Sequence, residues 1–503
     1  MSKKRFLKGI SYSYLRQITT LITGIISLPL LLNYFGNTNY GIWTLVLGLT
    51  GYINTVSFGI PSAMITLVAK SSNLNEKYRI LRKSFYILFV LSAIFLALFI
   101  FALYFNDDWI ISFLGNIDIE LISMTKNMFI LFVIFTLIKL PLNLYMQFFT
   151  GMNTIYISEI YQILTALINF FSVLVAIFFN IEIFNFVILW VTGQLLLNII
   201  AVFHVLIKFS YLKNEVDDVS NISNSVILKS GFAFFQVGIA ATIVWSTDNL
   251  IISHFMSPEF VTPYSIAFKI FTYIFIFSAI INGVIGPMYG NAYAKNDWES
   301  IRKYTTLIHK LLPILGALVW IFLIFFAKEI IVLWTGNKDA FGGYLLIFSL
   351  GLYGYVLSYV NTYATLLFSL NHAKDTLKIA WSEAILNLIL SIILIKIFGI
   401  GGVAFATAMA SFIACFMFFP RLVKRLTKGE VIYDFNYVKK HFIFLVIPFI
   451  LLSILIIDLN FILKIIIFIL ILLIYILVSW KLLSENDKLV FFSFVKRKEQ
   501  CNE

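Results

Sequence analysis

The chain has 503 residues, of which 61% are hydrophobic and only 12% charged, with a mean hydropathy of +0.95 and a net charge of +12. A soluble domain is about 45–50% apolar and about 25% charged, so one water-soluble core would leave too much apolar surface exposed. Nucleic-acid binding is excluded because the cations lie in short segments between apolar runs and not in a cluster on a soluble fold.

The apolar runs predict an all-α membrane protein that crosses the bilayer about 14 times. A membrane-spanning helix needs about 20 mostly apolar residues, and continuous runs favour helices over barrel strands, which alternate with a period of two. The break at residues 458–460 leaves open whether 441–480 forms two full spans. The predicted spans are residues 10–32, 41–69, 84–105, 124–149, 156–179, 184–207, 225–254, 264–288, 305–327, 343–369, 378–396, 401–420, 441–457 and 461–480.

The distribution of Lys and Arg predicts the orientation of these spans. With the N-terminus inside, the inner connections carry 27 Lys and Arg, whereas the outer connections carry Lys328 and Lys338. Inner loops are enriched in cations by the positive-inside rule, so both termini are predicted to be cytoplasmic. The basic start of the chain is followed by no small-residue cleavage site, which favours a retained first helix over a removed signal peptide.

Cysteine and histidine patterns predict neither a disulfide framework nor a metal site. Cys415 lies in an apolar run, and Cys501 is the third residue from the end of the sequence. The five histidines are not spaced like the ligands of a metal ion. No Gly-x-x-x-x-Gly-Lys-Ser/Thr string is present, and no connection is long enough for a soluble catalytic domain. We therefore expect no cofactor and no enzymatic activity.

An internal repeat at an offset of 218 residues predicts two lobes. Asn153, with residues 166–169, Ala-Leu-Ile-Asn, aligns with Asn371 and residues 384–387, Ala-Ile-Leu-Asn. Six spans return the chain to the same side, so the two lobes would be related by a pseudo-two-fold axis along the membrane normal, a common transporter plan. The predicted domains are residues 1–207 and 225–420 as six-helix lobes, 208–224 as a cytoplasmic linker, and 421–503 as two extra helices with a cytoplasmic tail.

Three local motifs carry a resemblance to a known family. Leu28 and Pro29 lead into residues 34–43, Tyr-Phe-Gly-Asn-Thr-Asn-Tyr-Gly-Ile-Trp, while residues 248–252 read Asp-Asn-Leu-Ile-Ile and residues 264–270 read Tyr-Ser-Ile-Ala-Phe-Lys-Ile. The chain resembles the Wzx-type oligosaccharide flippases of the polysaccharide transporter family. Their superfamily also holds MATE-type multidrug exporters and the lipid II flippase. The second lobe lacks the Gly-x-x-x-Tyr-Gly string of the first, which weakens the repeat.

The resemblance implies a MATE-like fold in the bacterial cytoplasmic membrane and movement of an undecaprenyl-pyrophosphate-linked oligosaccharide to the outer leaflet by alternating access, for O-antigen or capsule synthesis. The sugars would pass through a cavity between lobes while the polyprenyl tail stays in lipid. Implied partners are this lipid-linked substrate, membrane lipid and the polysaccharide polymerase machinery. Four energy sources stay open: a proton gradient, a sodium gradient, the membrane potential and the substrate gradient alone.

Ionisable residues inside predicted spans are candidate site residues, because each costs about 2.5–3.5 kcal/mol on insertion scales. Lys139 is the deepest, about 16 Å from the inner end of its span at 1.5 Å per residue. It would either attract the diphosphate or pair with an acid. Arg16 would either contact the diphosphate through its planar fork or extend to the inner surface. Glu159 and Glu383 take similar places near the inner ends of their spans.

Asp248 and Lys269 lie at similar depths on consecutive predicted helices, about 8–10 Å from the outer face. They would form either a structural ion pair or a gate coupled to an ion, with Lys269 also counted among the cavity cations. Uncharged polar residues such as Gln194, Asn169 and Asn387 are expected to form interhelical hydrogen bonds. Tryptophans toward the outer ends, Trp43 among them, are expected to form an interfacial belt.

Three alternatives to a flippase remain. A MATE-type, cation-coupled multidrug exporter would need acids on its cavity wall, whereas the deep charges here are mostly cations. A membrane glycosyltransferase or polymerase would need a large outer loop, and a scaffold would leave the intramembrane charges unexplained.

Overall fold

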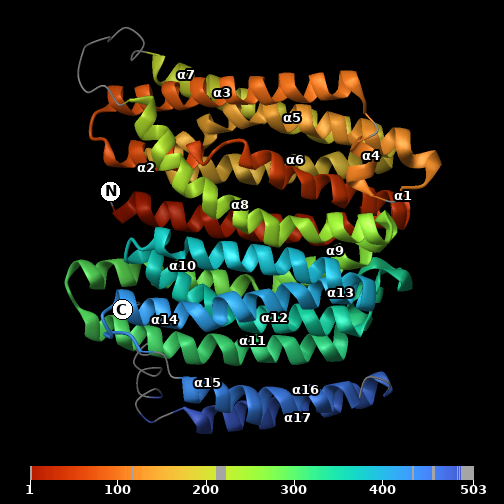
Figure 1. The fold of residues 1–503 in the computed structure, drawn as a ribbon, viewed down its shortest axis with the longest axis vertical. Helices are drawn as coiled ribbons and strands as arrows, with labels where there is room; N and C mark the ends of the chain where they lie inside the picture. Colours follow the sequence, from red (N-terminus) through yellow and green to blue (C-terminus); the bar gives the residue numbers. More distant parts are fainter. Residues whose placement is uncertain are drawn as a thin grey trace. The chain divides into compact units, whose positions relative to one another are not determined.

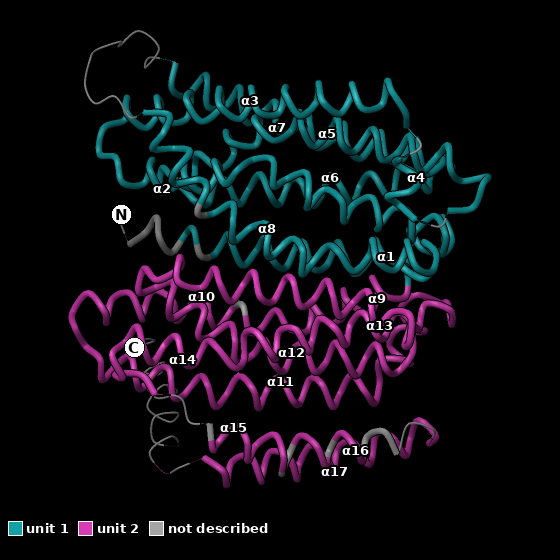
Figure 2. Tube along the Cα trace, in the orientation of Figure 1, with its two compact units in different colours: residues 1–262 teal, residues 263–503 magenta. Residues whose placement is uncertain are grey.

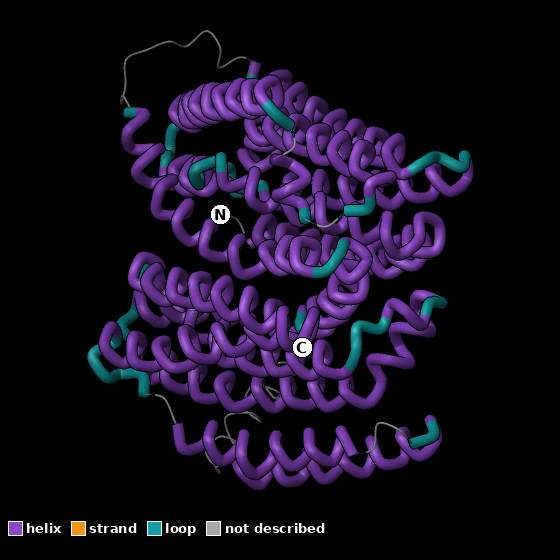
Figure 3. The backbone as a smooth tube through the Cα atoms, turned by 45° about the vertical axis from the view of Figure 1, so that its right-hand side comes forward, coloured by secondary structure: helices purple, strands orange, loops and turns teal. Residues whose placement is uncertain are grey.

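The computed structural model describes residues 3–107, 109–115, 117–210, 223–432, 435–455 and 459–483, together with Glu485 and Lys488. Within this part of the chain the secondary structure is helical and contains no strand (Figure 3). This confirms the predicted all-α class, as expected where lipid cannot satisfy open backbone groups. The chain divides into two compact units, Met1–Thr262 and Pro263–Glu503 (Figure 2).

The described residues of unit 1 form helices α1 to α8 and the start of α9 (Figure 1). Helix α6 packs against α1, α5 and α7, while α3 packs against α5. Helix α8 packs on α1 and α2. The bounds are α1 Lys3–Thr55, α2 Ile60–Lys70, α3 Leu74–Phe105, α4 Trp109–Leu114, α5 Ile119–Gly151, α6 Ile155–Phe178, α7 Ile183–Lys208, α8 Asn224–Phe255 and α9 Pro258–Ile274.

Unit 2 continues from the rest of α9 and centres on α12, which packs against α10, α11 and α13. Helices α16 and α17 both contact α11, and Figure 1 shows them side by side. The bounds are α10 Ile276–Ala294, α11 Trp298–Thr335, η2 Lys338–Ala340, α12 Tyr344–Ser369, η3 Ala373–Thr376, α13 Leu377–Ser411, the π-helical η4 Phe412–Phe416, α14 Met417–Leu426, α15 Phe435–His441, the π-helical η5 Phe442–Val446, α16 Ile447–Leu455 and α17 Phe461–Leu482.

Eleven helical runs in the described residues are long and apolar enough to cross a membrane, so the chain is a multi-pass membrane protein, but the count of 14 is not confirmed. Two of the runs contain a glycine with non-helical backbone, Gly36 at φ 78° in α1 and Gly399 at φ 57° in α13. These breaks fall between predicted spans 10–32 and 41–69, and between 378–396 and 401–420. Glycine tolerates such φ values because it has no Cβ.

The predicted span 41–69 is divided in the structure. Helix α1 ends at Thr55 and α2 begins at Ile60, with Phe58 and Gly59 both at positive φ between them. Helix α4 and the short η2 and η3 segments lie in connections where no helix was predicted. Residues 211–222 of the predicted linker, Asp458, and residues 489–503 of the predicted tail lie outside the described residues.

The two copies of the predicted repeat share one backbone turn. Asn153 and Asn371 adopt the left-handed conformation, at φ 57° and φ 64°. In each copy the Asn amide and the next amide bond to carbonyls three and five residues earlier, at 3.0 and 2.9 Å in the first copy and 3.1 and 2.8 Å in the second. The same turn also follows α6 at Asn180, outside the two aligned stretches. The turn is therefore not specific to the repeat, and the constant offset of 218 residues is the stronger support for it. The symmetry of the lobes stays a prediction.

Packing of α11 on α12 in unit 2 depends on Gly351. A Cβ at this position would lie 1.9 Å from Cδ1 of Trp320, whose side chain is buried. We therefore expect Gly351→Ala to destabilise the protein by about 1–3 kcal/mol through overpacking, seen as a lower melting temperature in detergent. Gly283→Ala in α10 is the matched control, since a Cβ there would have no neighbour within 4 Å. A Gly351→Ala variant as stable as that control would contradict the packing argument.

Candidate functional site: intramembrane charges of unit 1

Lys139 lies on α5 and is held by a row of polar side chains from three helices. Its Nζ donates to Oε1 of Gln194 on α7 at 2.5 Å, and Nε2 of Gln194 donates to Oδ1 of Asn169 on α6 at 3.0 Å. Gln194 is buried, and the ammonium also lies 5.3 Å from the ring centre of Phe135. No carboxylate of the described part of unit 1 forms a salt bridge with Lys139. Lys139 is therefore oriented by neutral groups, and no carboxylate in the described part of unit 1 compensates its charge.

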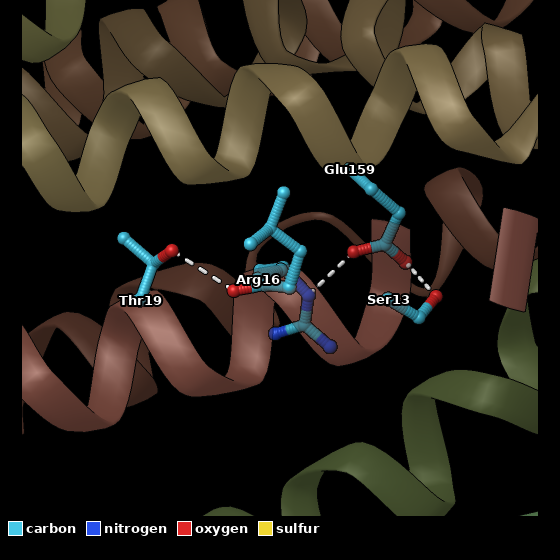
Figure 4. Close-up of polar contacts among 5 residues, drawn as sticks. Ser13, Arg16, Thr19 and Glu159 are labelled. Carbon is cyan, nitrogen blue, oxygen red and sulfur yellow. Dashed lines mark hydrogen bonds and ion pairs between the residues drawn. The ribbon is translucent and has the colours of Figure 1, made fainter. Parts of the chain in front are cut away.

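Arg16 on α1 forms an ion pair with Glu159 on α6 (Figure 4). Its Nε donates to Oε2 at 2.5 Å, and Ser13 Oγ donates to the other carboxylate oxygen at 2.8 Å. The Arg16 side chain remains 31% exposed, against 11% for Glu159. Figure 4 shows both Nη atoms directed away from Glu159. The edge of the guanidinium that suits bidentate phosphate binding is thus left outside this ion pair.

Helix α6 connects these two polar clusters. Glu159 and Asn169 are ten residues apart, which is about 15 Å along the axis, and they face different partners, α1 and α7. Sequence reasoning placed Arg16 and Lys139 on different helices but did not identify Glu159 as the partner of Arg16. The sequence signals for this pair were the serine three residues before Arg16 and the similar depth of Arg16 and Glu159 in their predicted spans.

Glu159 and Glu383 are not equivalent in their surroundings, although the sequence puts them at similar places in their spans. Glu159 is paired with a cation, whereas Oε2 of Glu383 on α13 accepts from the thiol of Cys415 at 3.0 Å. The expected interhelical role of amide side chains is seen for Gln194, which bonds Asn169 of α6. Asn387 Nδ2 donates to Thr407 Oγ1 at 2.8 Å within α13, across its break at Gly399.

Asp248 and Lys269 belong to different units. Asp248 is buried on α8 of unit 1, and Lys269 is half-buried on α9 in unit 2. Their pairing stays a prediction. Next to Asp248, Thr247 shares a hydrogen bond with Tyr52 of α1.

Small residues bring α1 and α8 close together at this depth. A Cβ at Gly51 would lie 2.8 Å from Ser246 Oγ, and one at Gly48 would lie 3.4 Å from Asn249 Nδ2. Such close approach of helices through glycine is typical of membrane interfaces. It holds the α8 segment that carries Asp248 against the second half of α1.

Trp43 does not belong to an interfacial belt, contrary to the prediction. It is buried in unit 1, with its ring centre 5.0 Å from that of Phe186 and 5.2 Å from that of Trp190. The reason is that aromatic side chains of α5 and α7 pack against its ring, Phe132 among them at 5.6 Å. Among the described residues, no group of three or more His, Cys, Asp or Glu side chains could hold a metal ion.

Comparison with solved structures places the fold among known transporters. The structure is similar to that of "Lipid II flippase MurJ" in an inward closed conformation, with a TM-score of 0.70 and 18% identity over 94% of this chain and 99% of that one. It is also similar to a multidrug resistance MATE family transporter in an inward-facing conformation, with a TM-score of 0.66 and 13% identity over 84% of this chain and 99% of that one. These likenesses confirm the predicted MATE-like fold.

Sequence comparison gives the family. The chain is 21% identical to the "Putative O-antigen transporter" of Salmonella typhimurium over 376 residues, 73% of this chain and 84% of that protein. A family model described as "MatE" matches residues 233–393, and one described as "Polysaccharide biosynthesis protein" matches residues 6–292. The latter match spans more than half of the chain, and the chain belongs to this family of polysaccharide biosynthesis proteins.

Proposed function

We propose that this chain moves an undecaprenyl-pyrophosphate-linked oligosaccharide across the cytoplasmic membrane by alternating access, as a step in the synthesis of a surface polysaccharide such as O-antigen or capsule. Family membership, the O-antigen transporter of Salmonella typhimurium and the fold of the lipid II flippase support this proposal. The observation that carries it is Lys139, a deep cation whose contacts in unit 1 are neutral.

The chemistry of the cargo explains why such a cation is useful. A diphosphate that enters a low-dielectric region loses its hydration, which costs far more than the transfer of a neutral group unless opposite charge compensates it. Lys139 would supply that charge, and Arg16 would add two donors through its Nη atoms. Lys269 is proposed as a third cation of the pathway, and Asp248 with Lys269 as a gate.

The proposal extends to topology and partners. Residues 1–207 and 225–420 would be the two lobes around the pathway, 208–224 the linker, and 421–503 the additional helices and tail, with both termini cytoplasmic. The chain would act as a carrier and not as an enzyme, powered by a substrate, proton or sodium gradient. The polysaccharide polymerase would receive its product.

The test is deletion of the gene with detection of the lipid-linked glycan in each membrane leaflet. We expect the glycan to accumulate in the inner leaflet and the surface polysaccharide to be lost, with both restored by the intact chain. The alternative function is that of a multidrug exporter, and the match of residues 233–393 to the family model described as "MatE" is the observation in its favour. Normal glycan display together with lost drug resistance would establish the exporter and refute the flippase.

A further inference from the structure

A basic pocket lies at one end of unit 1, away from the residues considered so far. Its volume is about 1040 Å³, and α3, α5, α7 and the start of α8 contribute to its wall. It falls at the predicted inner membrane surface, just before the predicted span 84–105. The lining residues are Tyr78, Arg79, Arg82, Lys83, Phe85, Tyr86, Tyr145, Leu206, Ser223 and Asn224.

Three cations line this pocket from one helix. Arg79, Arg82 and Lys83 are spaced at i, i+3 and i+4, so they share a face of α3. Among the described residues that line it, no side chain is acidic. The N-terminus of the 32-residue helix α8 borders the same space at Ser223 and Asn224, where the helix dipole also favours an anion. The electrostatics of the wall thus select negative charge.

The rest of the lining is aromatic and apolar. Tyr78 and Tyr145 are buried, and the ring of Phe85 stands edge-on to that of Tyr145 at 5.5 Å. The same face of α3 continues from Arg82 to Tyr86, which is 67% exposed, and then to the exposed Phe89. These exposed apolar side chains are expected to face lipid, because they enter the predicted span. The pocket therefore joins a cationic wall to an apolar surface.

We propose that this pocket binds the phosphate or diphosphate group of an anion, and that its apolar continuation selects an amphiphile, with the head group at Arg79, Arg82 and Lys83 and the acyl or prenyl chain along Tyr86 and Phe89. A wholly soluble phosphate would use the cations but gain nothing from the aromatic side. Cations near a membrane surface attract anionic lipid heads individually as well; what distinguishes this site is that three cations line the same pocket.

Binding to the purified full-length chain in detergent tests the site without any transport assay, so its failure and that of the proposed function are separable. The probes are dioleoylphosphatidylglycerol, zwitterionic dioleoylphosphatidylcholine and sodium pyrophosphate, each titrated while the melting temperature is followed. We expect phosphatidylglycerol to raise the melting temperature and phosphatidylcholine to leave it unchanged. Each of Arg79→Gln, Arg82→Gln and Lys83→Gln should weaken the apparent affinity about fivefold.

The matched control is Lys77→Gln, which removes a cation from the same end of α3 that does not line the pocket. Its affinity should stay at the wild-type value, and Arg82→Lys should recover most of what Arg82→Gln loses. A response to pyrophosphate alone, lost in the Gln variants, would support the phosphate site and assign it to a free anion. Equal weakening by Lys77→Gln, or no response to either of the two probes with net negative charge, would overturn the proposal. If one of the three Gln variants fails to fold, the other two carry the test.

Discussion

Lys139→Met is expected to lower glycan export about 10- to 100-fold while leaving the amount of protein in the membrane unchanged. A charge-assisted hydrogen bond to a diphosphate is worth about 1.5–3 kcal/mol, which corresponds to that range of rate or affinity. Met has a similar volume and no charge, so the desolvation cost of a deep ammonium disappears. We therefore expect the melting temperature to stay level or rise. Surface glycan per unit of protein, together with thermal unfolding in detergent, measures both effects.

Two further variants separate position from charge in this experiment. Lys126→Met removes a cation from the same helix, where Lys126 pairs with Asp107, and should leave export near the wild-type level. Lys139→Arg keeps the charge and should retain a substantial part of the activity. Full export by Lys139→Met would exclude Lys139 from the mechanism, and a matching fall with Lys126→Met would show a general effect of charge loss on α5.

Long apolar runs made the helices predictable, because composition alone decides whether a segment can lie in lipid. Helices α5, α6, α7 and α17 fall close to the predicted spans 124–149, 156–179, 184–207 and 461–480. Breaks within a run were harder to find. The discontinuity between Thr55 and Ile60 was missed because Phe58 and Gly59 sit in a stretch that is apolar throughout, and hydropathy does not report backbone conformation.

The site was predictable only where a single residue carries the signal. Lys139 and Arg16 stand out as charges in apolar spans, so depth alone identified them. Their partners did not, since the contacts with Gln194 and Glu159 join residues 55 and 143 positions apart and arise from the packing of α5 on α7 and of α1 on α6. The basic pocket was missed for a different reason. Arg79, Arg82 and Lys83 look like ordinary inner-loop cations until the fold brings residues of α5, α7 and α8 to the same pocket.

Neutralising either member of the Arg16–Glu159 pair is expected to destabilise the protein, and neutralising both is expected to restore stability without restoring export. A fully buried pair loses roughly 3–5 kcal/mol when one partner is removed. Here the side chains are 31% and 11% exposed, so we expect about 1–3 kcal/mol for Arg16→Gln or Glu159→Gln. In the double variant no charge is left uncompensated, so the two losses should not add. Thermal unfolding of the wild type, the two single variants and the double variant measures the coupling free energy between the two residues.

Export in the same four proteins then decides what Arg16 does. If its Nη atoms hold a phosphate, the double variant folds like the wild type yet exports poorly, because the donors are gone. The exposed pair of Arg302 with Glu430 has the same 2.5 Å separation, with side chains 50% and 40% exposed, and serves as the control: its double-mutant cycle should yield about 0–1 kcal/mol and unchanged export. Normal export by the Arg16→Gln, Glu159→Gln double variant would reduce Arg16 to a structural residue and leave Lys139 as the cation of unit 1 that meets the diphosphate.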